Sequence, residues 1–246
     1  MKKRLKLRTF RQGDAPKRGE GLRIGTTRRP PRGVNFLWDI GLLKNLRVEN
    51  IFDVGANTGQ SAREYLTRFP SARVFSFEPV ESSYRELVKS QGANRRFSAH
   101  RIAFGASAGQ ARMTVDGSSD LARFSEDGTE VVNVETLDGF CTQHAVERID
   151  LLKVDTEGHD LEVLEGARSM LSDQRIQLVQ VEAGMNPDNR LHVPFEALKA
   201  FLEKQGYLLF GVYEQALEWP SREPQLRRSN PVFISRRAVA ENSPCF

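Results

Sequence analysis

The chain has 246 residues, which is long enough to bury the core of one α/β domain. Its net charge of +4 is unevenly divided, because residues 1–33 hold 12 Lys and Arg against 2 Asp and Glu, whereas residues 34–246 hold 24 against 30. The larger part is acidic, so the basic overall charge does not indicate a nucleic-acid-binding domain.

Residues 1–33 are rich in Arg, Lys, Gly and Pro and offer few apolar side chains for burial. We interpret them as a flexible basic arm that precedes a domain over residues 34–246. Such an arm is either a solvated tail or a segment that attracts nucleic acid or an anionic membrane surface. Aromatic residues, on which single-stranded nucleic acids stack, are nearly absent from it, and this favours the tail.

The cysteine content and the hydropathy indicate a cytoplasmic setting. Cys141 and Cys245 are too few and too far apart for a disulfide framework or a zinc site, so we expect a reducing environment. The most apolar early segment, residues 36–43, contains Asp39. We therefore expect neither a signal peptide nor a membrane span.

After an apolar helical pattern at residues 36–46, strand-like and helix-like segments alternate along the chain. Parallel strands are predicted to end at 54, 78, 104, 155 and 182, helices to cover 58–68, 81–92, 160–171 and 194–205, and an antiparallel pair to form from 207–213 and 231–236. Residues 111–115 and 131–135 are interpreted as an inserted ribbon or loop region. The pattern predicts an α/β fold on a mostly parallel, seven-stranded sheet covered by helices on both faces. Ligands of such sheets bind beyond the carboxyl ends of the strands.

The sequence IFDVGANTGQ (residues 51–60) places Asp53, Gly55, Asn57 and Gly59 at alternating positions where the first strand turns into a helix. Glycine lets the backbone bend there and approach a ligand closely. A dinucleotide site would carry GxGxxG, and an acid before the first glycine would repel a pyrophosphate. The acid instead suits a ligand with an ammonium and a sulfonium, and Glu78 at the end of the second strand can accept both ribose hydroxyls. These features match S-adenosylmethionine; a tight turn in which Asp53 is a local cap is the alternative.

Five segments resemble, in the same order, the FkbM family of S-adenosylmethionine-dependent methyltransferases, within the class I (Rossmann-like) methyltransferase fold. They are FDVGANTGQ (52–60), FEPVESSYREL (77–87), HRIAFGASAG (100–109), VETLDGF (134–140) and LLKVDTEGHDLEVLEGA (151–167). The last segment is the most specific, although Asp160 stands where the family often has Glu and His159 where an aromatic residue is common. The resemblance implies O-methylation of a hydroxyl on a sugar, a glycan or a polyketide-type natural product.

The residues expected to bind the cofactor follow the first three strands and the fourth. They are Asp53, Gly55, Ala56, Asn57, Gly59, Gln60, Ser61, Glu78, Pro79, Ala103, Phe104 and Asp155.

Acidic residues after the fourth and fifth strands are the catalytic candidates. An aliphatic hydroxyl has a pKa of about 16, so its oxygen needs a general base or a metal before it can attack the methyl group. Asp155 is the first candidate base, with Glu157 and His159 in the same turn and Glu182 at the end of the neighbouring strand. Capping of the following helix is the alternative role for Asp155 and Glu157. Lys153 is assigned no chemistry.

The same carboxylates suit Mg²⁺, but we do not favour a metal, because a hard-metal site needs further ligands that the pattern does not supply. The expected partner is a small-molecule or glycan acceptor and no specific nucleic acid; the sequence carries no signal for an oligomeric state. One alternative is an RNA methyltransferase guided by the basic arm, which the acidic domain and the lack of a base-flipping aromatic motif oppose. Another is a non-catalytic binding protein on the same fold, which the presence of Asp53 and Glu78 opposes.

Overall fold

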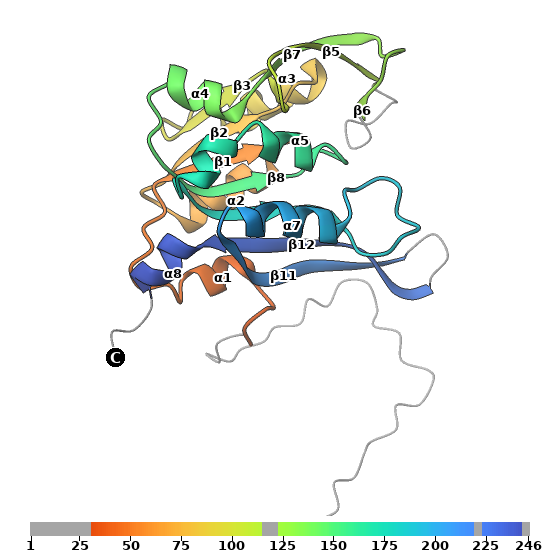
Figure 1. The fold of residues 1–246 in the computed structure, drawn as a ribbon. Helices are drawn as coiled ribbons and strands as arrows, with labels where there is room; N and C mark the ends of the chain where they lie inside the picture. Colours follow the sequence, from red (N-terminus) through yellow and green to blue (C-terminus); the bar gives the residue numbers. More distant parts are fainter. Residues whose placement is uncertain (1–30, 115–122, 219–222, 243–246) are drawn as a thin grey trace, which may run out of the picture. The chain divides into compact units, whose positions relative to one another are not determined.

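The main feature of the structure, a computed structural model that describes residues 31–114, 123–218 and 223–242, is a single large sheet (Figure 1). Its strands run in the order β3-β2-β1-β8-β9-β12, with β11 on the far side of β12. They are β1 (Asn50–Val54), β2 (Arg73–Phe77), β3 (Phe97–His100), β8 (Ile149–Val154), β9 (Ile176–Val181), β11 (Tyr207–Glu218) and β12 (Glu223–Ser235). The strands pair in parallel except at β12, which is antiparallel to both β9 and β11. The mostly parallel sheet and its closing antiparallel pair are therefore confirmed.

One strand of this sheet was not predicted. The two-residue β10 (Ala183–Gly184) pairs with Arg228 and Ser229 of β12, which gives the sheet eight strands by this count instead of seven. The additional strand forms because β12, with 13 residues, is longer than β9, with 6. The part of β12 that continues past the end of β9 is free to pair with β10. This extension brings Arg228 to the carboxyl edge of the sheet.

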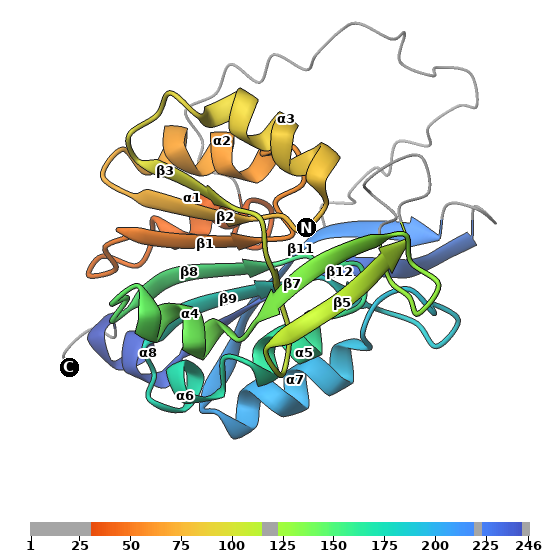
Figure 2. The same cartoon turned by 90° about the horizontal axis from the view of Figure 1, so that it is seen from above.

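Helices cover both faces of the sheet (Figure 2). The helices are α1 (Phe36–Ile40), α2 (Gln60–Arg68), α3 (Glu81–Gln91), α4 (Leu137–Gln143), α5 (Asp160–Glu165), α6 (Arg168–Ser172), α7 (Phe195–Lys204) and α8 (Arg236–Asn242). Residues of α4 to α7 pack on one face, around Phe52 and Leu152, and residues of α1, α2 and α8 pack on the other, around Ile51 and Leu151. Successive residues of a strand point to opposite faces of the sheet, and helices cover both faces. Every residue of β8 and β9 is therefore buried.

A second, smaller sheet has the order β4-β7-β5-β6. It consists of β4 (Ala103–Phe104), β5 (Gly109–Thr114), β6 (Arg123–Phe124) and β7 (Glu130–Glu135). It confirms the inserted ribbon but corrects the third strand, which was predicted as one element ending at residue 104. Pairing with β2 stops at His100, and Ala103 and Phe104 pair instead with β7, so the chain crosses here from one sheet to the other.

Two predicted helices are also shorter than their patterns. The helix expected over 160–171 is divided into α5 and α6, because the Gly166 carbonyl accepts the Asp138 backbone N–H at 2.9 Å and leaves the helical ladder. The pattern over 36–46 is helical only as far as Ile40 and continues as turns whose apolar residues still pack on the domain. Among the described residues, no helix has both the length and the hydropathy that crossing a membrane requires. Of the predicted arm, all but residues 31–33 lies outside the described ranges, and its flexibility stays a prediction.

Asp138 anchors the start of α6, and its removal should destabilise the fold without touching the carboxyl edge of the sheet. Its carboxylate accepts the backbone N–H groups of Ser169 at 2.7 Å and Met170 at 2.9 Å. Asp138→Ala should lower the free energy of unfolding, measured in urea, by about 1–2 kcal/mol. The exposed Glu147→Ala is the control and should change it by less than about 0.5 kcal/mol. Equal stability of the two variants would contradict this capping role.

Candidate active site

A cavity of about 490 Å³ opens at the carboxyl ends of β1, β2 and β8. Its walls contain most of the residues expected to bind the cofactor or act in catalysis: Gly55, Ala56, Asn57, Gln60, Ser61, Glu78, Pro79, Ala103, Phe104, Asp155, Glu157 and His159. They also contain residues that were not predicted, namely Val54, Phe77, Val80, Ile102, Met113, Phe124, Lys153, Thr156 and Arg228. Asp53, Gly59 and Glu182, which were predicted, are not part of these walls.

The loop between β1 and α2 explains the alternating motif. Gly55, Asn57 and Gly59 have positive φ angles of 77°, 47° and 91°, a conformation that glycine adopts freely and asparagine more readily than most residues. Gly55 also lies against the next strand, because a Cβ built on it would stand 1.8 Å from the carbonyl oxygen of Asp155. The motif therefore encodes a backbone path that brings this loop against the end of β8.

Glu78 is held in one orientation by the same loop. One carboxylate oxygen accepts the Asn57 backbone N–H and the other accepts that of Val80, both at 2.9 Å. The residue is 6% exposed, and this burial raises the pKa of Glu78 to about 7 despite the two hydrogen bonds. A carboxylate fixed in this way on a cavity wall is suited to accept hydroxyl groups from a ligand.

Beyond Glu78 the cavity wall is apolar. It is formed by Val80, Ile102, Met113 and the pair Ala103–Phe104, which β4 carries away from the main sheet. Phe104 is 2% exposed and its ring lies 4.7 Å from that of Phe77, so it belongs to the core as well as to the wall. A flat apolar group fits this end of the cavity.

Asp53 lies beneath the cavity in a buried polar row. Ser76, Asp53, Lys153 and Gln180 are register partners on the neighbouring strands β2, β1, β8 and β9. Asp53 is fully buried; its carboxylate lies 3.5 Å from the Lys153 ammonium and accepts the Ser76 hydroxyl at 3.5 Å. Burial raises the pKa of Asp53. The structure therefore places Asp53 behind the site, where it balances charge, and its contact with a cofactor stays a prediction.

Lys153 sets the charge of Asp155, the first candidate base. Its ammonium donates to the Asp155 carboxylate at 2.9 Å. Burial opposes ionisation of both groups, but their mutual attraction lowers the pKa of Asp155, and the carboxylates of Asp155 and Asp53 raise the pKa of Lys153. Asp155 is consequently an ionised, strongly paired carboxylate, which makes it a weak base for an alcohol.

Glu157 lies two residues after Asp155 on the same cavity wall, but in a different environment. Its backbone is left-handed, with φ 53°, and burial, followed by the charges of Glu182 and Asp155, raises the pKa of its carboxyl group. His159, the last predicted residue of this turn, packs its ring edge-to-face on Phe124 at 4.5 Å, and burial lowers its pKa. Of the two carboxylates in the turn, that of Glu157 is therefore the stronger base.

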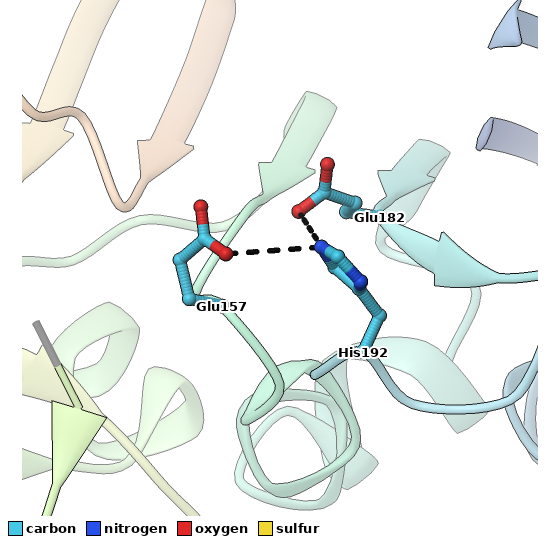
Figure 3. A group of neighbouring side chains, drawn as sticks. All are labelled: Glu157, Glu182 and His192. Atoms are coloured by element: carbon cyan, nitrogen blue, oxygen red, sulfur yellow. Dashed lines mark ion pairs between the residues drawn. The ribbon is translucent and has the colours of Figure 1, made fainter. Parts of the chain in front are cut away.

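Glu182 directly follows β9 and is 4% exposed. Its carboxylate is close to the side chains of Glu157 and His192 (Figure 3). His192 approaches both carboxylates, with Nε2 lying 3.0 Å from Glu182 and 3.7 Å from Glu157. Arg228 pairs with the other oxygen of Glu182 at 2.5 Å. The two catalytic candidates Glu157 and Glu182 are thus in contact with His192 or Arg228, which were not predicted from the sequence.

The site residues that were not predicted differ in whether the sequence contains any sign of their role. Lys153 follows two leucines and precedes a valine in a strand that is buried along its whole length, and a lysine at such a position indicates a buried ionic partner. His192 and Arg228 come from a loop and from a strand far along the chain, and no spacing connects either with Glu182.

Comparison with known proteins agrees with this geometry. The family model described as the methyltransferase FkbM domain matches residues 53–209, which include the end of β1, all of β2, β8 and β9, and the loops at the carboxyl ends of these strands. The chain belongs to this family. Together with the strand order, this membership identifies the class I methyltransferase fold that was predicted.

Relatives of this FkbM-family chain include two enzymes that are named as methyltransferases. It is 27% identical over 141 residues to the hexuronic acid methyltransferase AglP of Haloferax volcanii, a match that covers 56% of this chain and 57% of AglP. It is 25% identical over 145 residues to the 2-O-methyltransferase NoeI of Sinorhizobium fredii, covering 51% of this chain and 60% of NoeI. The chain thus matches less than two thirds of the length of either relative.

A solved structure was also matched. It is Sp1610 of Streptococcus pneumoniae, a putative tRNA (m1A22) methyltransferase in complex with S-adenosyl-L-methionine, with 12% identity and a TM-score of 0.46 over 80% of this chain and 71% of that one.

Substitution of Gly55 tests the contact between the two loops. Gly55→Ala places a methyl group against the Asp155 carbonyl in a left-handed backbone, and it should lower the free energy of unfolding by about 2 kcal/mol or more. Gly109→Ala is the matched control, because nothing lies within 4 Å of its Cβ position. Thermal and urea unfolding of both variants give the comparison, and similar losses would show that the close approach is unimportant.

Proposed function

We propose that the protein is an S-adenosylmethionine-dependent O-methyltransferase whose acceptor is a hydroxyl group of a sugar or glycan. The observation that carries the cofactor assignment is the Glu78 carboxylate, fixed by two backbone N–H groups on the wall of the cavity. The acceptor class rests on the family and on the names of the two curated relatives, which favour a sugar over a polyketide-type product.

Each part of S-adenosylmethionine has a chemically suitable part of the cavity wall. The ribose hydroxyls would donate to Glu78, and the adenine would lie in the apolar end between Val80, Ile102 and Ala103–Phe104. The methionine part would follow the Gly55 loop, with its carboxylate near the start of α2, where unpaired backbone N–H groups and the helix dipole attract an anion. The ionised Asp155 would then face the positively charged end of the cofactor.

The transfer itself is an in-line displacement. The acceptor oxygen forms a bond to the methyl carbon while the bond from that carbon to sulfur breaks, and the hydroxyl proton is released. We assign activation of the hydroxyl to Glu157, because its carboxylate is on the cavity wall and its pKa is raised, whereas the pKa of Asp155 is lowered by Lys153. Asp155 is assigned to orientation of the cofactor and acceptor.

Three expectations from the sequence stay predictions: the cytoplasmic setting, the absence of a specific nucleic-acid partner, and the roles of the individual site residues. The RNA methyltransferase and the non-catalytic binding protein are the competing outcomes of the experiments that follow.

Calorimetric titration at several pH values tests the cofactor site. S-adenosylmethionine should bind and NAD should not. Because Glu78 accepts the ribose hydroxyls best when ionised, affinity should fall as the pH drops through about 7, by up to about tenfold per pH unit. Glu78→Gln should bind more weakly and lose this part of the pH dependence, while retaining any that comes from the cofactor's own amino group. An unchanged pH profile in Glu78→Gln would overturn the ribose assignment.

Methyl transfer from isotopically labelled cofactor tests the roles of the two carboxylates. With uronic acid and neutral sugar acceptors, Glu157→Gln should lower kcat by about 10²-fold or more and leave cofactor affinity within about twofold. Glu196→Gln, an exposed substitution on α7, is the control. Labelling of RNA in place of sugars would favour the RNA methyltransferase, and cofactor binding without transfer to any acceptor class would favour the non-catalytic protein.

A further inference from the structure

Glu157, Glu182 and His192 place three potential ligand atoms around one point (Figure 3). They come from the loop after β8, the end of β9 and the loop before α7. One oxygen from each carboxylate and one ring nitrogen all lie within 4.8 Å of one another. Two donors bonded to the same ion at about 2.1 Å are at most about 4.2 Å apart, and both distances from Nε2, 3.0 and 3.7 Å, are within this limit. The two carboxylate oxygens, which lie within 4.8 Å of each other, would have to approach by at most about 0.6 Å to share the ion.

Glu182 supplies an independent sign that the cluster lacks a component. Its Oε1 is paired with Arg228, but its Oε2 is buried and accepts no hydrogen bond from any described residue. Although Nε2 of His192 lies 3.0 Å from this oxygen, no N–H is aligned with it. A buried carboxylate oxygen without a donor is costly, and the cost is removed when a cation binds there.

The His192 ring is already oriented as a ligand would be. Nδ1 contacts the Asn189 side chain, at 3.1 Å from its oxygen and 2.9 Å from its nitrogen. The Asn189 amide is in turn held by backbone groups of Leu191, His192 and Arg227. Contacts of this kind fix the orientation of metal-binding histidines, and here they aim Nε2 at the two carboxylates.

Glu157 connects this cluster to the cavity. Its side chain is 34% exposed and is part of the cavity wall, whereas the side chains of Glu182 and His192 are 5% and 3% exposed. The neighbouring Gly158 allows the approach, because a Cβ on it would lie 2.3 Å from the Leu191 carbonyl oxygen, next to His192. An ion in the cluster would therefore be bound from one side by protein and reached from the other through the cavity.

We propose that Glu157, Glu182 and His192 bind a divalent first-row transition ion such as Mn²⁺ or Zn²⁺. One imidazole with two carboxylates suits these ions better than Mg²⁺ or Ca²⁺, which prefer sites made of oxygen alone. Two carboxylates also give the cluster the negative charge that a divalent ion needs, part of which Arg228 offsets.

A role for this ion rests on the proposed function, whereas its binding does not. An open coordination position on the cavity side would take the acceptor hydroxyl and lower its pKa. The hydroxyl proton would then pass to water, the oxygen would bond to the methyl carbon, and the bond from that carbon to sulfur would break. Glu157 would act in this case as a ligand and not as a base.

Titration of the chelator-treated, full-length protein with MnCl₂ and ZnCl₂, without cofactor or acceptor, tests the site. Calorimetry should show one ion per chain bound more tightly than Mg²⁺ or Ca²⁺. His192→Ala and Glu157→Gln should each weaken binding at least tenfold. His144→Ala, at an exposed histidine after α4, and Glu196→Gln are the matched controls and should bind as the wild type does.

Thermal unfolding of each variant shows whether the fold is retained, and the half-exposed Glu157→Gln supplies the result if His192→Ala does not fold. The proposal is overturned if the wild type binds neither Mn²⁺ nor Zn²⁺, or if the controls lose as much affinity as the cluster variants. In that case His192 is only a neighbouring side chain that packs beside the two carboxylates. Since binding is measured without methyl transfer, failure of the methyltransferase assays leaves this result unaffected.

Discussion

The pairing of the Lys153 ammonium with two carboxylates is the interaction on which the site depends. A buried ammonium is strongly destabilising unless opposite charges surround it, and here Asp53 and Asp155 are at 3.5 and 2.9 Å. The pairing joins β1 to β8 at one register level and keeps Asp155 ionised at the edge of the cavity. Loss of Lys153 would leave both carboxylates without this cation, so the charge balance of the cavity and the alignment of β1 with β8 depend on the same residue.

The loops above this row obey a second constraint, which is closeness of backbones. Gly55 lies against the Asp155 carbonyl, and Gly158 lies against that of Leu191. The first contact positions the N–H group that holds Glu78, and the second brings His192 beside Glu157. The positions of these polar side chains are therefore determined by close contacts between backbones. Only glycine fits at residues 55 and 158, because a Cβ there would collide with a carbonyl oxygen.

Much of the fold and part of the site could be predicted from the sequence. Alternating apolar patterns located the five parallel strands, and the DxGxNxG and KVDTEGHD segments identified the carboxyl edge where the cavity lies. The environment of Asp53 could not be predicted, because its position beside a glycine loop is the same whether the carboxylate faces a ligand or a buried lysine. His192 and Arg228 could not be predicted, since each enters the site through tertiary packing of a segment without a motif. The transfer of Ala103 and Phe104 to a second sheet depends likewise on β7, whose paired residues lie 31 positions further along the chain.

The position of β12 between β9 and β11 also bears on the order in which the protein assembles. Glu182 emerges at the end of β9, yet its partner Arg228 is synthesised 46 residues later, on the strand that inserts between β9 and β11. A nascent chain can pair β1, β2, β3, β8 and β9 before that strand exists, but its acidic cluster is then uncompensated and its sheet edge is open. Completion of the site is consequently coupled to the last step of sheet formation, so ligand affinity reports whether the chain has finished folding.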